Sequence, residues 1–421
     1  MSRFPADAPL PPLRTKLEAV PSEEDGQEIF LLRDLEELTD KTIALSAGGM
    51  LLASLLDGRR TAAQALALFN KSADAAVEDG VLLELVDALD EAGYLETPAV
   101  AKKRAAALEM FRASPKRAAA FSGTAYAAAP EELTRELDAF TAAAFAGAAP
   151  AAPVKAAPRG LIAPHIDFTR GGPAYARAYR ALADRRPPDV VVALGVAHVS
   201  PESPWTFTPK DYETPLGALR VDGELYDALS KKVWYEPRAD EWVHKNEHSL
   251  EFQAVWLRRL WGDQAPPWVP ILVSSFARYA GEDAPSKAPE IEKALNDFGA
   301  VLREQAARGR RVLVLCGVDF AHVGPRFGDE LEITPELEKK IEDTDRKSLV
   351  DALTLDADGF YRAGVGEGAW RKVCGLSALY TGLRLIKSLD DAQPGRLLDY
   401  GQAPDPAGGV VSFASAVFDA P

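Results

Sequence analysis

Short apolar segments alternate with helical segments from about residue 160 to the end of the chain. The apolar run at 190–194 is continuous, which is typical of a strand that is covered on both faces of a sheet. Strands that alternate with helices predict an α/β domain, built on a mostly parallel or mixed sheet flanked by helices. The strands are predicted at 161–163, 190–194, 269–273, 312–316, 397–400 and 410–418, with a hairpin-like excursion at 205–221. The helices are predicted at 173–183, 247–260, 289–307, 336–353 and 376–386.

The first hundred residues carry a different pattern, with short helices next to short strands. Ser46 and Thr61 each precede an apolar helical segment and are suitable N-caps. The pattern predicts a small winged-helix-like domain. Its predicted elements are a strand at 29–32, helices at 46–56, 62–69 and 77–92, and a wing strand at 94–97. The predicted parts of the chain are an irregular N-terminus at 1–27, the winged-helix-like domain at 28–100, a connector at 101–117 and the α/β domain at 118–421.

Composition excludes several classes of partner. The chain has 48 Lys and Arg against 63 Asp and Glu, and its formal net charge of −15 argues against a nucleic-acid partner. No apolar stretch approaches the roughly 18 residues of a membrane span, and the N-terminus lacks a signal pattern, so we expect a cytoplasmic protein. The two cysteines, Cys316 and Cys374, exclude a disulfide framework. Residues 141–158 are rich in Ala and Pro, which predicts a flexible or polyproline-like connector.

The five histidines all follow residue 164, and three of them hold the same place relative to a strand. His165, His198 and His322 each come just after a predicted strand of the α/β domain. Binding sites in open α/β sheets lie beyond the carboxyl ends of the strands. Three imidazoles at three strand ends therefore predict one shared site rather than three separate structural histidines.

Acidic residues accompany these histidines. Asp319 precedes His322 by three positions, and Glu247 is adjacent to His248. A carboxylate in such a place can orient a ligand imidazole through its second nitrogen, or it can act as a general base. Glu251 lies on the same helix face as His248, but taken alone it is more typical of a solvated surface charge.

Cys374 comes just before the predicted helix at 376–386. The helix N-terminus and the neighbouring Arg371 and Lys372 lead us to expect a lowered thiol pKa. A thiolate is a soft metal ligand or a nucleophile. Cys316 ends an apolar strand and is expected to be inert core.

A second interpretation concerns residues 244–248. His244, Glu247 and His248 fit the inverted zinc-peptidase motif H-x-x-E-H. On a helix, the two histidines would bind zinc and the glutamate would activate water, which would make the protein a zinc hydrolase. This hypothesis leaves the strand-end histidines unexplained.

Six segments carry a family resemblance in the C-terminal part. They are "IAPHIDF", "LGVAHVS", "ETPLGALRVD", "NEHSLEFQ", "GVDFAHVG" and a "VCG" before a helix. In this order they resemble the Memo family (AmmeMemoRadiSam system protein B), whose fold is similar to class III extradiol dioxygenases, which use a non-haem iron. The resemblance implies metal ligands at His165, His198 and Cys374. The residues that it implies as supporting or acid/base groups in the same cavity are His322, His248, Asp319 and Glu247.

The chain also departs from the family pattern, and its N-terminal part resembles a second family. Phe121 and Ala125 stand where the Memo family has His and Trp, which alters the wall of the site. Upstream, "IALSAGGMLLASLLDGRRTAAQALALF" and "VLLELVDALDEAGYLE" resemble PqqD-like domains, which are peptide-binding winged helices. This second resemblance implies a peptide or an enzyme as a partner of the N-terminal part.

The sequence therefore favours a cytoplasmic protein that binds a redox-active divalent metal through two histidines and one cysteine. Iron is the first choice, copper the second, and zinc is a further candidate, because two nitrogens and one thiolate suit a soft or borderline ion. As an enzyme it would be an oxidoreductase similar to extradiol dioxygenases, acting on an unidentified small molecule or peptide. The alternatives are a non-catalytic module of a modifying-enzyme system and the zinc hydrolase.

Overall fold

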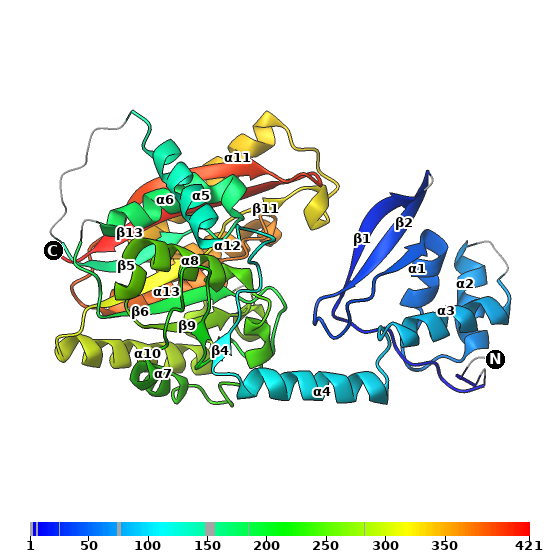
Figure 1. The fold of residues 1–421 in the computed structure, drawn as a ribbon. Coiled ribbons are helices and arrows are strands. Elements are labelled where there is room, and N and C mark those ends of the chain that lie inside the picture. Colours follow the sequence, from blue (N-terminus) through cyan, green and yellow to red (C-terminus); the bar gives the residue numbers. More distant parts are fainter. Residues whose placement is uncertain are drawn as a thin grey trace. The chain divides into compact units, whose positions relative to one another are not determined.

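The structure, a computed structural model, describes residues 3–5, 7–24, 26–73, 77–147, 156–183, 185–281 and 283–421. The chain forms two compact units, Met1–Ala113 and Ser114–Pro421. Each unit has a hydrophobic core of its own. The two units are therefore described one at a time (Figure 1).

The N-terminal unit packs helices against an antiparallel sheet, whose described strands have the order β1-β2-β3. Leu32 and Leu45 of the sheet meet Leu52, Leu66 and Leu82 of three helices in the core. The strands are β1 (Leu17–Glu24), β2 (Gln27–Asp34) and β3 (Ile43–Ser46). The helices are α1 (Ala47–Ser54), α2 (Ala62–Ala73), α3 (Asp79–Glu91) and α4 (Pro98–Ala113).

Local sequence sets the helix ends of this unit as predicted. The Ser46 hydroxyl accepts the Gly49 N–H at 3.2 Å and caps α1. Thr61 and Gln64 bond each other's backbone N–H groups at the start of α2, which is a capping box. Gly58 has a φ of +80° in the turn between these helices, a conformation that glycine adopts without strain.

The N-terminal unit differs from three expectations. Residues 17–24 were expected to be irregular, but they pair with β2 along their whole length. The expected wing at 94–97 forms no strand among the described residues. There, Leu95 makes a single bridge to Leu13, because Tyr94 and Leu95 are buried in the core instead of lying along a sheet edge. Most of the expected connector at 101–117 is helix α4.

The C-terminal unit is built on a mixed sheet, which has eight strands in the described part of the chain. Their order is β11-β13-β5-β10-β6-β9-β7, and β12 pairs with β13. β5, β10, β6 and β9 are parallel, whereas the outer strands run antiparallel to their neighbours. The strands are β5 (Pro158–Ala163), β6 (Val190–Val196), β7 (Trp205–Phe207), β9 (Trp268–Val273), β10 (Val312–Gly317), β11 (His322–Val323), β12 (Arg396–Pro404) and β13 (Val410–Asp419). A separate parallel pair joins β4 (Lys116–Arg117) to β8 (Asp211–Tyr212).

Helices cover both faces of this sheet (Figure 1). In β6, Val190 and Val192 point into one core cluster and Val191 points into the other, because successive strand residues face opposite sides. The predicted α/β fold with a mixed sheet and flanking helices is confirmed. On one face lie α5 (Pro130–Ala144), α6 (Phe168–Ala183) and α8 (His248–Trp261). On the other lie α7 (Gly223–Ser230), α10 (Pro289–Ala307), α11 (Pro335–Leu353), α12 (Ala357–Val365) and α13 (Leu376–Ser388), and α9 (Ala277–Ala280) is a short additional helix.

Several parts of the C-terminal unit escaped prediction. Helices α7 and α12 were not predicted, and the excursion at 205–221 holds only the short strands β7 and β8 and one bridge from Tyr212 to Leu219. In the predicted Ala/Pro-rich connector, residues 141–144 continue α5, and 148–155 lie outside the described residues. Among the described helices, none has both the length and the apolar character that crossing a membrane requires.

Candidate metal centre

Three neighbouring parallel strands deliver polar side chains to one edge of the sheet. β5, β10 and β6 lie side by side, and the segments that follow them carry His165, Asp319 and His198. Carboxyl ends of parallel strands meet at one edge of a sheet. The topology alone therefore brings together residues that are far apart in the sequence.

A further histidine joins this edge from α8. His248 is the first residue of α8, and the carboxylate of Glu247 caps the helix by accepting the Ser249 N–H at 3.0 Å. One ring nitrogen each of His165, His198 and His248 lies within 4.8 Å of the other two. The ring centroids are 4.9–5.3 Å apart. Nitrogens in such a group can hold one metal ion.

Hydrogen bonds fix the tautomers of two of these rings. The Nδ1 of His165 lies 2.9 Å from the Gly317 carbonyl, which can only accept, so Nδ1 carries the proton and Nε2 keeps its lone pair. The Nδ1 of His198 lies 3.0 Å from the Glu247 carboxylate, which also can only accept, so this Nδ1 carries a proton as well. Burial lowers the pKa of His165 well below its usual value, so this ring is neutral. Ligand histidines in metalloproteins are oriented by such partners.

One carboxylate holds two of the three rings. The Oε1 atom of Glu247 lies 3.0 Å from the Nδ1 of His198 and 3.3 Å from the Nδ1 of His248. Burial opposes the charge of Glu247, but the two imidazoles outweigh it and hold the pKa of Glu247 well below its usual value. Burial also opposes the charge of His198, and the Glu247 carboxylate and Cys374 outweigh it and raise the pKa of His198. At His248 burial prevails and lowers the pKa to about 4.

Cys374 lies against the same group, with its Sγ 3.3 Å from the Nε2 of His165. Burial raises the pKa of this thiol, so the expectation of a lowered pKa is wrong. The expected cations point elsewhere, since Arg371 pairs with the buried Asp345 and Lys372 pairs with a surface carboxylate. A bound metal ion would itself deprotonate the thiol.

Asp319 and His322 flank the three histidines. Asp319 accepts the backbone N–H of His165 at 3.0 Å, and its second oxygen lies 3.6 Å from the Nε2 of that ring. Burial raises the pKa of Asp319 to about 7. His322 is outside the group of three, and its Nδ1 lies 3.1 Å from the Phe320 carbonyl. Burial lowers the pKa of His322 to about 4.

The group is accessible to solvent from one side. The side chains of His198 and His248 are 36% and 30% exposed, whereas that of His165 is 2% exposed. The ring of Phe121 packs edge-on against His248 with centroids 5.7 Å apart. His198 and His248 are therefore the members of the group that solvent reaches, and Phe121 packs beside them.

Comparison with known proteins identifies the family. The sequence model of the family described as Memo-like protein matches residues 117–417, which include every residue of the site. The chain belongs to the Memo-like family. Its relatives include a MEMO1 family protein of Aquifex aeolicus, 27% identical over 390 residues (92% of this chain and 96% of the relative). MEMO1 family proteins of Methanopyrus kandleri (28% over 267 residues, 62% and 82%) and Thermus thermophilus (29% over 269 residues, 64% and 72%) are also similar.

The Aquifex protein matches more of this Memo-like chain than the Methanopyrus protein does. A match over 390 residues is longer than residues 114–421, so it extends into the N-terminal unit. The Methanopyrus match covers 62% of this chain and 82% of the relative. The similarity to the Aquifex protein therefore extends beyond the C-terminal unit.

His248 is the main difference between the predicted and the observed site of this Memo-like protein. The family resemblance implies an acid/base role for His248, with His165, His198 and Cys374 as ligands. In the structure its ring nitrogen belongs to the group that can hold a metal, and Cys374 lies next to His165. The signal for this in the sequence was the Glu247–His248 pair at a helix start, since such a cap places both side chains at the same sheet edge.

The geometry does not support the H-x-x-E-H interpretation. His244 ends a 3-10 helix, Glu241–His244, and is separate from α8, which begins at His248. Its Nε2 donates to the Thr206 carbonyl at 2.9 Å, and its Nδ1 accepts from the Tyr212 hydroxyl at 2.7 Å. Both ring nitrogens are thus engaged within the protein, and neither is free for a metal.

Glu251 is buried, which corrects its interpretation as a solvated charge. It is 0% exposed, pairs with Arg117, and accepts the Tyr126 hydroxyl and the Phe121 N–H. Arg117 also donates to the carbonyl of Glu247 at 2.9 Å. This ion pair therefore fixes Phe121 and the start of α8 beside the histidines. The sequence could not show it, because the partners are 134 positions apart.

Proposed function

We propose that the C-terminal unit binds one divalent transition-metal ion through His165, His198 and His248, with Cys374 beside it. The observation that carries this proposal is that three ring nitrogens from three different elements lie within 4.8 Å of one another. The hydrogen bond of His165 already leaves a lone pair at its Nε2, whereas His198, whose raised pKa favours the imidazolium, would lose its Nε2 proton when the ion binds.

The donor set is suitable for a redox-active ion. Imidazoles suit iron, copper and zinc, and a neighbouring thiol adds preference for softer ions. Iron remains the first choice and copper the second, because the resemblance to the extradiol dioxygenases implies an oxidoreductase that uses a redox-active ion. Such an ion supplies Lewis acidity and one-electron chemistry. The chain supplies Asp319, a buried carboxylate 3.6 Å from the Nε2 of His165 that can exchange a proton beside the ion, and an accessible side at His198 and His248.

Metal analysis of the purified protein tests this proposal. The wild type, reconstituted with Fe²⁺ in the absence of oxygen, or with Cu²⁺ or Zn²⁺ without added reductant, and then desalted, is expected to retain one ion per chain. His165→Ala and His198→Ala are expected to lose it. Glu247→Gln is expected to weaken binding about 10–100-fold, because it removes the carboxylate that orients two rings.

His244→Gln is the matched control, because this histidine lies outside the group and is expected to leave the metal content unchanged. His248→Gln and Cys374→Ser distinguish the two ligand sets. Loss of the ion in Cys374→Ser, together with a sulfur-to-metal absorption band in the wild type, would replace His248 by Cys374 as third ligand. Full metal content in both His165→Ala and His198→Ala would refute the metal centre itself.

For the N-terminal unit we infer a winged-helix-like module that binds an extended peptide, as the resemblance to PqqD-like domains implies. In its favour, the described sheet order β1-β2-β3 leaves β1 and β3 as outer strands, and an outer strand can pair with an added peptide strand. Hydrogen exchange measured with and without a pool of peptides tests this. Peptide-dependent protection of β1 or β3 amides is expected, and protection at neither strand would overturn the inference.

A further inference from the structure

A buried ion pair lies close to the candidate metal centre, in the segment that leads to Cys374. It joins Asp345 of α11 to Arg371, which comes three residues before Cys374, and the two side chains are 0% and 2% exposed. The attraction within such a pair is largely cancelled by the lost hydration of both charges, so a buried ion pair contributes little to net stability. What it does fix is the geometry of the segments that bond to it.

Arg371 is held at both its side chain and its backbone. Its guanidinium donates to Asp345, to the Ser348 hydroxyl at 2.9 Å and to the Ala363 carbonyl at 2.9 Å. Its backbone carbonyl accepts the His322 N–H at 2.7 Å. The segment between α12 and α13 is therefore fastened to α11 on one side and to β11 on the other.

The backbone of this segment is in a conformation that needs such an anchor. Ala369 and Lys372 have φ angles of +54° and +47°, which residues other than glycine rarely adopt. Strained conformations of this kind persist only where the surrounding contacts over-determine them. Arg371 lies between these two residues, and Cys374 follows two residues after Lys372. The backbone that Arg371 anchors therefore sets the place of the Cys374 Sγ beside His165.

The second oxygen of Asp345 holds the segment that follows β10. It accepts the hydroxyl of Ser412 and, at 3.0 Å, the hydroxyl of Tyr400. The Ser412 hydroxyl in turn accepts the Ala321 N–H at 2.8 Å. Ala321 directly precedes His322, so this oxygen supports the histidine that flanks the candidate metal centre.

We propose that Asp345 is a positioning residue of the candidate metal centre. Through Arg371 it holds the segment that carries Cys374. Through Ser412 it holds the segment that carries His322. A carboxylate suits this double task because both of its oxygens accept, whereas an amide would offer one acceptor oxygen. The inference rests on the proposed function for its chemical meaning, since these segments deliver a thiol and an imidazole to the proposed ion. The contacts themselves involve no ion and can be tested in the metal-free protein.

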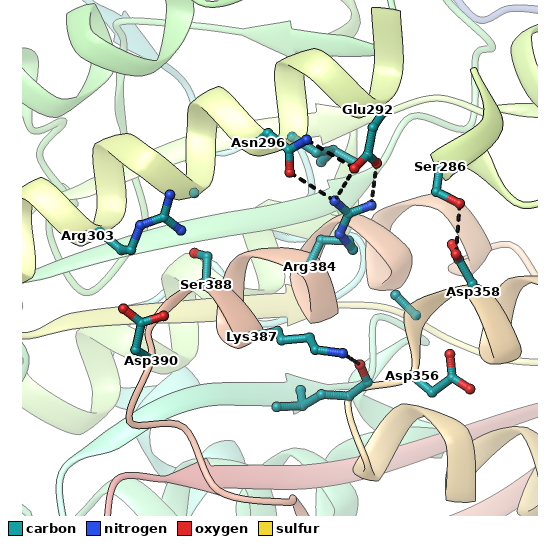
Figure 2. Close-up of a pocket in the computed structure, with 14 residues that line it drawn as sticks. Ser286, Glu292, Asn296, Arg303, Asp356, Asp358, Arg384, Lys387, Ser388 and Asp390 are labelled. Atoms are coloured by element: carbon teal, nitrogen blue, oxygen red, sulfur yellow. Dashed lines mark hydrogen bonds and ion pairs between the residues drawn. The ribbon is translucent and has the colours of Figure 1, made fainter. Parts of the chain in front are cut away.

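A hollow of about 430 Å³ between α10, α12 and α13 contains an ion pair of another kind (Figure 2). There Arg384 bonds Glu292, and their side chains are 20% and 31% exposed, so water screens the pair. The hydrogen bonds of Arg384 run within α13 and to α10. The pair of Asp345 and Arg371 differs because both partners are buried and their contacts lead to the site.

Thiol alkylation and amide hydrogen exchange in the metal-free protein test the proposal. Ser348→Ala removes one support of Arg371, and iodoacetamide is expected to alkylate Cys374 about five- to tenfold faster, because a lost hydrogen bond changes a local opening equilibrium by about that factor. Exchange of the Ala321 amide is expected to stay unchanged in this variant. Ser412→Ala is expected to give the reverse pattern, with faster exchange at Ala321 and unchanged alkylation of Cys374.

Asp345→Asn is expected to raise both rates in one protein, because it weakens both links at once. Tyr400→Phe is the matched control, since it removes a hydrogen bond to the same carboxylate oxygen but lies on β12, which carries no residue of the site. Both rates are expected to stay at their wild-type values in this control. Cys316 is 0% exposed and does not contribute to the alkylation. The two serine variants keep the test valid if Asp345→Asn proves unstable.

Two outcomes would overturn the proposal. One is wild-type rates in both serine variants. The other is a joint rise of both rates in every variant, Tyr400→Phe included, in step with a lower melting temperature, which would mean that the ion pair only stabilises the fold. Metal content of the wild type is measured in parallel and separates this proposal from the proposed function. A wild type that binds no ion would refute the metal centre and leave the alkylation and exchange results standing.

Discussion

At the scale of single residues, hydrogen-bond partners decide which histidines can hold a metal. His165 and His198 each donate from Nδ1 to a fixed acceptor, so that Nε2 is the atom directed at the group, whereas both nitrogens of His244 are bonded within the protein. The strand-end positions of His165 and His198 were visible in the sequence. The engagement of His244 was not, because its partners Thr206 and Tyr212 come from a distant excursion.

The buried His244 also predicts a pH dependence of stability. Burial lowers its pKa in the folded protein to about 3, while an unfolded histidine titrates near 6.5. Below about pH 6.5 the unfolded chain therefore binds a proton that the folded chain does not. Between about pH 6.5 and pH 3, this proton lowers the free energy of unfolding by up to about 1.4 kcal/mol for each unit that the pH falls. Above pH 6.5 His244 has no effect on the pH dependence.

Urea unfolding at pH 6.5 and pH 5.0 measures this contribution. From pH 6.5 to pH 5.0, the free energy of unfolding is expected to fall by about 2 kcal/mol more in the wild type than in His244→Gln. The other histidines titrate alike in both proteins, so their effect cancels in the comparison. An equal loss in the two proteins would show that His244 is not held neutral by burial.

At the scale of elements, strands were predicted better than short helices. The central strands are apolar on both faces, so a continuous run such as 190–194 marks them clearly. Helices α7 and α12 have eight and nine residues, too few turns for a clear helical period. β1 was missed because it is a strand of the small sheet that contains Pro21 and several charged residues.

Close packing of α13 on the sheet gives a prediction for Gly382. A Cβ at this position would meet the Sγ of Cys316 and lie 3.3 Å from Leu194, both of them core residues of the strands beneath. Burial raises the pKa of Cys316 to about 12, so this thiol is an inert part of the core. Gly382→Ala is expected to destabilise the unit by about 1–3 kcal/mol, although alanine favours helix by about 1 kcal/mol.

Gly223→Ala is the matched comparison, since a Cβ at the first residue of α7 meets nothing within 4 Å. It is expected to leave the urea midpoint unchanged or slightly higher. If Gly382→Ala were as stable as Gly223→Ala, the helix would not be packed as closely on β10 as the structure shows.

At the scale of the whole molecule, two separate cores predict two unfolding events. Leu82 belongs to the core of the N-terminal unit, and the histidines belong to the C-terminal unit. Calorimetry is expected to show two transitions. Added metal is expected to raise the unfolding temperature of only the C-terminal unit, because a ligand stabilises the unit that binds it. Leu82→Ala is expected to lower the free energy of unfolding of the N-terminal unit by about 2–5 kcal/mol, and with it the temperature of the other transition. A single transition that responds to both changes would contradict this.

Most of the fold could be predicted from the alternation of strands and helices in the sequence, whereas the side-chain contacts of the site could not. The sequence located the strand-end residues because parallel topology brings strand ends together. It could not locate contacts made across elements, such as Arg117 with Glu251 or Cys374 with His165, since sequence distance says nothing about them. Those contacts are what orient the rings and fix the thiol.

The contacts of Glu247 with both His198 and His248 have a consequence for how the proposed metal centre can evolve. His198 follows the end of a strand and His248 begins a helix, yet the Nδ1 atoms of both rings contact the carboxylate of Glu247. A substitution at position 247 would remove the common hydrogen-bond partner of two proposed ligands at once, so the position of one ring cannot be changed without affecting the other. Adaptation to a new ion would have to begin at His165 or Cys374, whose supports are independent of that carboxylate.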